Sequence, residues 1–184
     1  MKISVINYSS RKNGNGYHIV EYIKDIIVRQ NGRYDLIDFS SFATNSCGTC
    51  NYECFDNDCV YENDEIYRAY RKILNSNIVI SVIPIYGGLP CSNFFVFNER
   101  AQGAFKDDEF EQLERIKNKY IIIGNTGTEI TKKIIYENDE HAKEEDFLII
   151  SSNEVGERSI KGNLMDYDRY REKVCRFVVH SIFR

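Results

Sequence analysis

Residues 2–16 read KISVINYSSRKNGNG, a short apolar run that leads into a turn rich in Ser, Asn and Gly. The run from Lys2 to Tyr8 predicts a buried strand, because it is short and carries branched apolar residues. Beyond the turn, isoleucines recur at helical spacing between residues 19 and 27, and Gly32 provides a stop signal. A strand, a loop and a helix in this order favour a β–α–β unit and a parallel sheet.

The same alternation of strand and helix signals continues along the chain. Further strands are predicted at residues 34–39, 77–83, 120–123 and 147–151, and further helices at 66–74, from Pro90, at 129–143 and at 165–183. Five strands with interleaved helices predict an α/β protein, with a five-stranded parallel sheet in a three-layer α/β/α fold. We expect residues 1–184 to form a single domain, in which residues 40–60 are a polar, cysteine-bearing loop.

Composition excludes several classes of function. The 184 residues carry a net charge of −4, and their basic residues are scattered among acidic ones, so we expect no nucleic-acid partner. The apolar run at the N-terminus is too short for a signal peptide, and no stretch approaches the length of a membrane helix. We therefore expect a cytoplasmic protein with no membrane partner.

The turn after the first strand is a candidate phosphate site. In open α/β sheets, ligands bind beyond the carboxyl ends of the strands, where a helix start offers unpaired N–H groups. Gly14 and Gly16 allow close approach of the backbone, and Arg11 can make a charge-assisted contact. Neutral donors are available from Ser9, Ser10, Asn13 and Asn15. Neither GxxxxGK[ST] nor GxGxxG is present, and the alternative reading is a solvated polar turn.

Two motifs carry a family resemblance over about residues 1–128. YSSRKNGNG at residues 8–16 resembles the GSPRKNGNT turn of the NAD(P)H-dependent FMN reductase and flavodoxin-like family. IPIYGGLPCSNFFVFNER at residues 83–100 is similar to the family pattern SPVYxGSVSAxLKxFxDR, without a gap. The chain departs from the family at Gly16, where Thr is usual, and at Ile83 and Phe95, where Ser or Gly and Lys are usual. The loss of the Thr hydroxyl would cost a phosphate bond worth about 1 kcal/mol.

The resemblance implies a flavodoxin-like fold and an FMN site made by three loops. The first turn would hold the FMN phosphate, and the next two loops would approach the isoalloxazine ring. The ring contacts would fall on Pro84, Ile85, Tyr86, Gly87 and Gly88, and on Asn125, Thr126 and Gly127.

The function implied is an FMN-dependent oxidoreductase. Electrons would pass from NAD(P)H through FMN to a flavin, a quinone or another small-molecule or protein acceptor. The cofactor performs this chemistry, so no catalytic side chain is expected. The resemblance also implies a homodimer or higher homo-oligomer. The alternatives are a flavodoxin-like or iron–sulfur electron carrier that is not an enzyme, and a degenerate relative used as a binding or regulatory module.

Four cysteines lie close together in the 40–60 loop, at Cys47, Cys50, Cys54 and Cys59. Thiolates at this spacing suit a [4Fe–4S] cluster or tetrahedral zinc. The iron–sulfur flavoprotein branch carries a similar run, usually with two residues between its second and third cysteines, whereas this chain has three. The loop is therefore predicted to hold a cluster, to keep unmetallated thiols, or to bind zinc or form a disulfide.

Overall fold

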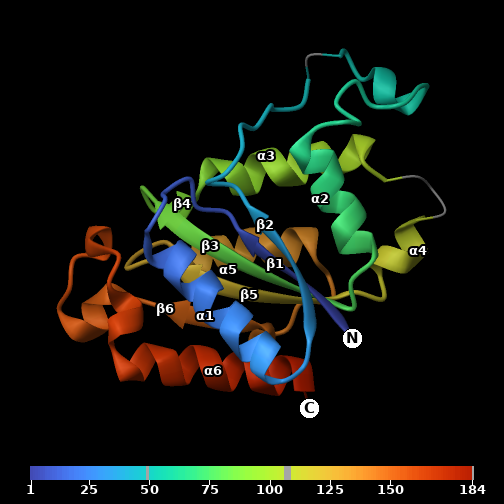
Figure 1. Ribbon diagram of the computed structural model, residues 1–184. Helices are drawn as coiled ribbons and strands as arrows, with labels where there is room; N and C mark the ends of the chain where they lie inside the picture. The colour runs from blue at the N-terminus through green and yellow to red at the C-terminus, as the bar shows by residue number, and fades with distance from the viewer. Residues whose placement is uncertain (49, 106–108, 184) are drawn as a thin grey trace.

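The strands form one sheet in the order β2-β1-β3-β5-β6, and neighbouring strands on this path are parallel. The computed structural model describes residues 1–48, 50–105 and 109–183. The bounds are β1 (Lys2–Asn7), β2 (Arg33–Asp38), β3 (Ile78–Tyr86), β5 (Lys117–Ile123) and β6 (Phe147–Ile150). The predicted five-stranded parallel sheet is confirmed (Figure 1).

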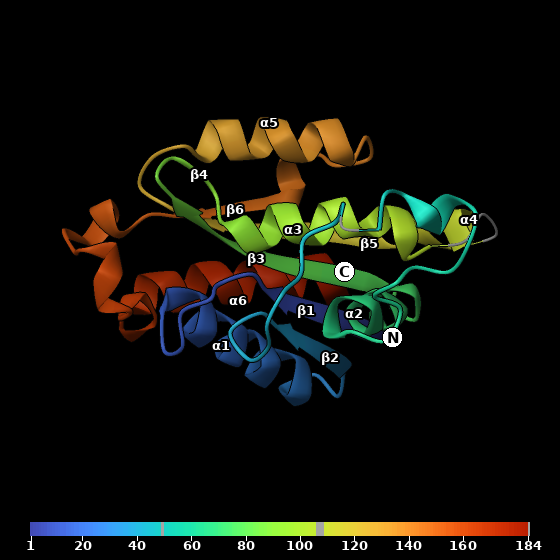
Figure 2. The same ribbon diagram turned by 90° about the horizontal axis from the view of Figure 1, so that it is seen from above.

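Helices cover both faces of this sheet, which gives the three predicted layers (Figures 1 and 2). One face carries α1 (Asn15–Arg29) and α6 (Asp168–Phe183), and the other carries α2 (Glu65–Leu74), α3 (Ser92–Arg100) and α5 (Thr128–Asn138). The short α4 (Phe110–Leu113) follows α3 in the chain.

The central strands alternate between two apolar cores. In β1, Ile3 and Val5 pack in the core under α1 and α6, whereas Ile6 packs in the core under α2 and α3. In β3, Ile80 and Ile83 divide between the same two cores. Successive side chains of a strand point to opposite faces, so a strand covered on both sides is apolar throughout. This is why the sequence shows continuous apolar runs here.

The strand β3 runs further than the sequence predicts. It extends to Tyr86, and a two-residue strand β4 (Leu89–Pro90) turns back antiparallel against Ile85 and Tyr86. The prediction that Pro90 begins the next helix is therefore wrong, because α3 starts at Ser92. A proline is tolerated in an edge strand of this kind, where its missing N–H breaks no ladder bond.

Two helix boundaries also differ from the predicted ones. The helix α5 ends at Asn138 rather than 143, since the acidic run beyond it turns back to the sheet, where Asp139 accepts a 2.6 Å hydrogen bond from Tyr120. The helix α6 begins at Asp168 rather than 165, after a 3₁₀ turn over Leu164–Asp166. The second difference lies close to the candidate site, because the Leu164 N–H donates to the side chain of Asn15 at the start of α1.

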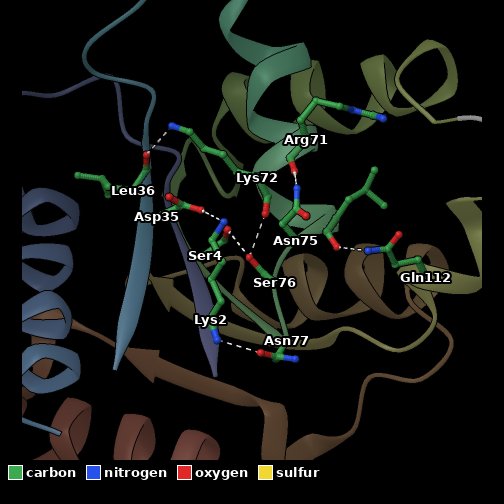
Figure 3. Close-up of polar contacts among 11 residues, drawn as sticks. Lys2, Ser4, Asp35, Leu36, Arg71, Lys72, Asn75, Ser76, Asn77 and Gln112 are labelled. Carbon is green, nitrogen blue, oxygen red and sulfur yellow. Dashed lines mark hydrogen bonds and ion pairs between the residues drawn. The ribbon is translucent and has the colours of Figure 1, made fainter. Parts of the chain in front are cut away.

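Polar contacts join the strands at the amino edge of the sheet, opposite the candidate site (Figure 3). The hydroxyls of Ser4 and Ser76 lie 2.8 Å apart, and the Lys2 backbone N–H donates to Asn77 at 2.8 Å. These bonds fix where β1 and β3 begin, and hence the level at which they end. In the described part of the chain, no helix combines the length and apolar character needed to cross a membrane.

Candidate functional site

Three loops meet at the carboxyl edge of the sheet around a cavity of about 310 Å³. They follow β1, β3 and β5, which are neighbours in the sheet, and β1 stands where the strand order reverses direction. Such a switch point is where open α/β sheets bind ligands. The lining residues are Ser9, Arg11, Gly14, Asn15, Gly16, Pro84, Ile85, Tyr86, Gly87, Gly88, Ile123, Gly124, Asn125, Thr126, Ser159 and Ile160.

At one end of the cavity lies the turn that leads into α1. The helix begins after Gly14, which has no side chain to cap it, so the first N–H groups of α1 point out of the helix without a side-chain partner among the described residues. Among the described residues that line the cavity, Arg11 is the one with a charged side chain, and none is a carboxylate. A positive dipole end and a guanidinium together favour an anionic group.

The turn is held in place by Asn7, a buried residue at the end of β1. Its side-chain oxygen accepts a 3.1 Å hydrogen bond from the Ser9 N–H, and its amide donates to Asp38 at 2.9 Å. A β-carbon at Gly16 would lie only 2.8 Å from that same oxygen. A side chain at this position, such as the family's Thr, would therefore require the Asn7 side chain or the turn to shift. Sequence reasoning missed Asn7, although a polar residue at the end of an apolar strand was available as a signal.

The turn is also tied to α3. The Asn93 amide, which is buried, donates 2.9 Å bonds to the Tyr8 carbonyl and to the Ser10 hydroxyl. The Cys91 thiol donates to the same carbonyl at 3.3 Å. Burial raises the pKa of Cys91 to about 11, because a low-dielectric surrounding disfavours the thiolate. Cys91 is therefore a packed, protonated residue near the site.

At the other end of the cavity, two loops touch backbone to backbone. Gly88 and Gly127 both have positive φ, and a β-carbon at Gly127 would lie 2.1 Å from the Gly88 carbonyl oxygen. Next to them, the Ile85 side chain packs over Gly124, where a β-carbon would lie 2.8 Å away. Ile85 therefore gives this end of the cavity an apolar surface, and a side chain at Gly124 or Gly127 could not be placed without moving its neighbours.

Tyr86 connects the two ends of the cavity. Its hydroxyl lies 3.3 Å from the Ser9 hydroxyl, while the ring is 44 % exposed. A half-exposed aromatic ring beside glycines offers a flat apolar surface to a planar ligand.

Comparison with known proteins identifies the family. Residues 1–127 match the model of the family described as NADPH-dependent FMN reductase. The chain belongs to this family. The match ends at the loop after β5, so it contains the three loop segments that meet at the cavity.

Solved structures show the same flavodoxin-like fold. An FMN-dependent NADH-azoreductase from Bacillus anthracis in complex with FMN is 12 % identical, with a TM-score of 0.62 and coverage of 97 % of this chain and 100 % of that one. The flavoenzyme NAD(P)H:(acceptor) oxidoreductase FerB from Paracoccus denitrificans is 13 % identical, with a TM-score of 0.59 and coverage of 99 % and 95 %. Oxidised flavodoxin 1 from Bacillus cereus is 12 % identical, with a TM-score of 0.57 and coverage of 100 % and 99 %. No curated protein sequence matches.

The family assignment makes this chain an FMN-dependent NAD(P)H oxidoreductase. Within the site of this reductase, Asn15 of the predicted phosphate set has its side chain engaged by the protein itself. Both ends of the Asn15 amide are bonded, to the Ser159 carbonyl at 2.9 Å and to the Leu164 N–H at 3.1 Å. Asn13, at φ +58, lies beside the cavity lining with its carbonyl against Gly162.

The third loop is held by the end of β6. The Asn125 amide donates to the Ser152 hydroxyl at 2.9 Å, and its oxygen accepts from the Ser151 hydroxyl at 2.9 Å. Asn125 and Thr126 line the cavity, whereas Gly127 stands behind them against Gly88. Two further lining residues, Ser159 and Ile160, come from beyond the family match, and no pattern in the sequence points to them.

The four cysteines lie apart from this cavity, beside α3. Burial raises the pKa of the Cys54 thiol, and the neighbouring thiols of Cys50, Cys59 and Cys47 raise it further. A β-carbon at Gly103 would lie 3.1 Å from the Cys59 sulfur and 3.3 Å from the Cys54 β-carbon. All four are free thiols, and no group of three His, Cys, Asp or Glu among the described residues has an arrangement that could hold a metal.

Proposed function

We propose that the cavity binds FMN across its two ends, with the phosphate at residues 9–16 and the isoalloxazine ring against residues 84–88 and 125–127. One observation carries the proposal. A single cavity joins an uncapped helix start and the guanidinium of Arg11 to a wall of backbone, Ile85 and the Tyr86 ring. An amphipathic ligand with a phosphate at one end and a planar ring at the other matches that polarity.

The residues present fit this cofactor. A cavity of about 310 Å³ lies at the lower end of the size range of small-molecule sites, which begins at roughly 300 Å³. Arg11 supplies a charge-assisted contact, and Gly14 and Gly16 keep the helix start open to a phosphate. Ser9 and Asn125 are held by hydrogen bonds within the protein, so the cradle is formed before the cofactor enters.

When bound, FMN would supply the redox chemistry between NAD(P)H and an electron acceptor. The chain contributes binding and orientation. The acceptor we propose is a flavin, a quinone or another small molecule, because Tyr86 and the two glycines after it leave the ring end open toward solvent.

The visible spectrum of the freshly purified protein tests cofactor binding, and stopped-flow mixing with NADPH and with NADH tests the reaction. A reductase shows flavin bands that bleach rapidly with at least one nicotinamide. An electron carrier shows the bands without that rapid bleaching. A protein that neither retains nor rebinds FMN would instead be a binding or regulatory module.

The gathering of Cys47, Cys50 and Cys59 around Cys54 supports one alternative, an electron carrier with a [4Fe–4S] cluster. As the described thiols lie, the loop would have to rearrange to hold a metal. Iron analysis after anaerobic purification decides between the two: about four irons per chain supports the cluster, and a protein free of iron leaves the cysteines as thiols.

We further propose that residues 1–184 fold as one domain that forms a homodimer or higher homo-oligomer. Phe95 on α3 is 40 % exposed while its neighbours Phe94 and Phe97 are buried, and Ile130 and Tyr136 on α5 are also exposed. Exposed apolar side chains on two helices of the same face are typical of a subunit interface. Analytical ultracentrifugation tests this, and a monomer at all concentrations would contradict it.

A further inference from the structure

The loop between β6 and α6 lies against the turn that starts α1 (Figures 1 and 2). We propose that residues 156–164, here called the strap, position Arg11 and the turn at residues 9–16 for a phosphomonoester. The inference rests on the proposed function, because the phosphomonoester is that of FMN. It assigns a role in cofactor recognition to a segment that lies beyond the family match at residues 1–127.

Side chains of the turn donate hydrogen bonds to backbone carbonyls of the strap. The Arg11 guanidinium donates to the Ile160 carbonyl at 2.7 Å, and the Asn15 amide donates to the Ser159 carbonyl at 2.9 Å. Arginine has five N–H donors, so the bond to Ile160 leaves others for a ligand. The strap therefore fixes the direction of the guanidinium and keeps part of it available.

The backbone of the strap also packs directly against the backbone of the turn. Gly162 has φ +74, and a β-carbon there would lie 2.9 Å from the Asn13 carbonyl oxygen and 3.5 Å from the Gly14 α-carbon. Gly14 is the residue that precedes α1, so the strap presses on the turn where the helix N–H groups emerge. Only a residue without a side chain fits at this contact.

The strap is itself anchored on the side away from the turn. Glu157 accepts a 2.9 Å hydrogen bond from the Tyr167 hydroxyl, and its backbone N–H donates to the Ser152 carbonyl at 3.1 Å. Within the strap, Glu157 also pairs with Lys161 at 2.5 Å. At the end of the strap, Leu164 is buried in the core under α1 and α6. A segment held at both ends can hold Arg11 in one place.

Holding Arg11 in advance lowers the entropy that binding must remove, and the gain applies only to a ligand with a phosphate. Riboflavin has the same ring as FMN and lacks the phosphate. The strap is therefore expected to favour FMN over riboflavin, whereas a purely structural role would affect both ligands equally.

Gly162→Ala tests this by displacing the strap from the turn. Fluorescence titration of the apoprotein should show a Kd for FMN raised on the order of tenfold, which is about 1.4 kcal/mol, with the Kd for riboflavin unchanged. Gly156→Ala is the matched control, because Gly156 has φ +67 and no atom within 4 Å of the added β-carbon, so both Kd values should stay as in the wild type. Arg11→Gln should reproduce the selective loss, and combining it with Gly162→Ala should add little.

The outcomes separate the inference from the function on which it rests. A wild type that binds FMN no more tightly than riboflavin overturns both the proposed phosphate site and the strap. A wild type that prefers FMN, with a Gly162→Ala variant that keeps this preference, overturns the strap alone. Equal weakening of both ligands in Gly162→Ala also overturns it. If thermal melting shows that this variant does not fold, Glu157→Gln loosens the strap from its far side, and a preference for FMN reduced about threefold is then expected.

Discussion

The two ends of the cavity are built in different ways. At the ring end, the loops after β3 and β5 touch through glycine backbone, and their strands are neighbours in the sheet. At the phosphate end, the turn after β1 is held by side-chain hydrogen bonds, some of them from a strap about 150 positions away in the chain. The ring end therefore depends on steric fit and tolerates little change. The phosphate end combines close glycine contacts at Gly16 and Gly162 with polar bonds of modest individual strength, so the loss of a single hydrogen bond there should have a graded effect.

Gly127→Ala should have the largest effect on stability and on FMN binding, since it separates the two loops that touch at the ring end. The new β-carbon would meet the Gly88 carbonyl oxygen at 2.1 Å in a residue with φ +75, so we expect about 3 kcal/mol less stability and loss of FMN binding. Chemical denaturation measures the stability. Gly87→Ala is the control, with φ +62 and open space around the β-carbon, and should cost about 1 kcal/mol. Equal losses for the two variants would contradict steric contact between the loops.

Gly16→Thr should destabilise the turn at the phosphate end by about 2 kcal/mol, although it restores the residue usual in the family. The cause is the 2.8 Å approach of the β-carbon to the Asn7 side-chain oxygen. Adding Asn7→Ala should recover at least about 1 kcal/mol in a double-mutant cycle. Gly14→Ala, with its nearest contact at 3.3 Å, should have a smaller effect. Additive losses from Gly16→Thr and Asn7→Ala would show that the Asn7 side chain does not cause this loss.

The burial of the Cys91 thiol, which donates to the Tyr8 carbonyl, can be tested by how the stability of the protein depends on pH. The folded thiol has a pKa of about 11, against an ordinary value of 9.0, so the thiol of the unfolded chain loses its proton first as the pH rises. The stability that this thiol contributes is complete below pH 9 and decreases between pH 9 and pH 11, by up to about 3 kcal/mol. Urea denaturation across this range should show a steeper loss for the wild type than for Cys91→Ala. Parallel curves would mean that the thiol is not buried as described.

Tyr86→Phe should have the smallest effect, because it removes one 3.3 Å hydroxyl contact to Ser9 and leaves the ring surface intact. We expect a loss of stability of less than about 1 kcal/mol and a Kd for FMN within about threefold of the wild-type value. Fluorescence titration provides the measurement. A tenfold loss of affinity for FMN would contradict the small contribution expected of the Ser9–Tyr86 hydroxyl contact.

The sequence predicted correctly the features that depend on residues close together in the chain. Alternation of apolar strands and amphipathic helices predicted the five parallel strands, and the turn motifs placed three loops at one edge. Pro90 was assigned to the wrong element, because a proline at a helix start and one in a two-residue edge strand look alike in sequence.

What the sequence could not provide depends on contacts between distant residues. The fit of Gly16 against Asn7, and of Gly127 against Gly88, follows from the way the strands bring the loops together. The use of Asn15 to hold the strap could not be predicted, because nothing in residues 156–164 marks them as part of a binding site.

The crystal structure of the complex with FMN is the most direct test of the account. We predict the phosphate within hydrogen-bond distance of Arg11 and of the first N–H groups of α1, with the isoalloxazine ring against Tyr86 and the Gly88–Gly127 contact. A flavin bound outside this cavity, or one whose phosphate lies away from residues 9–16, would contradict it.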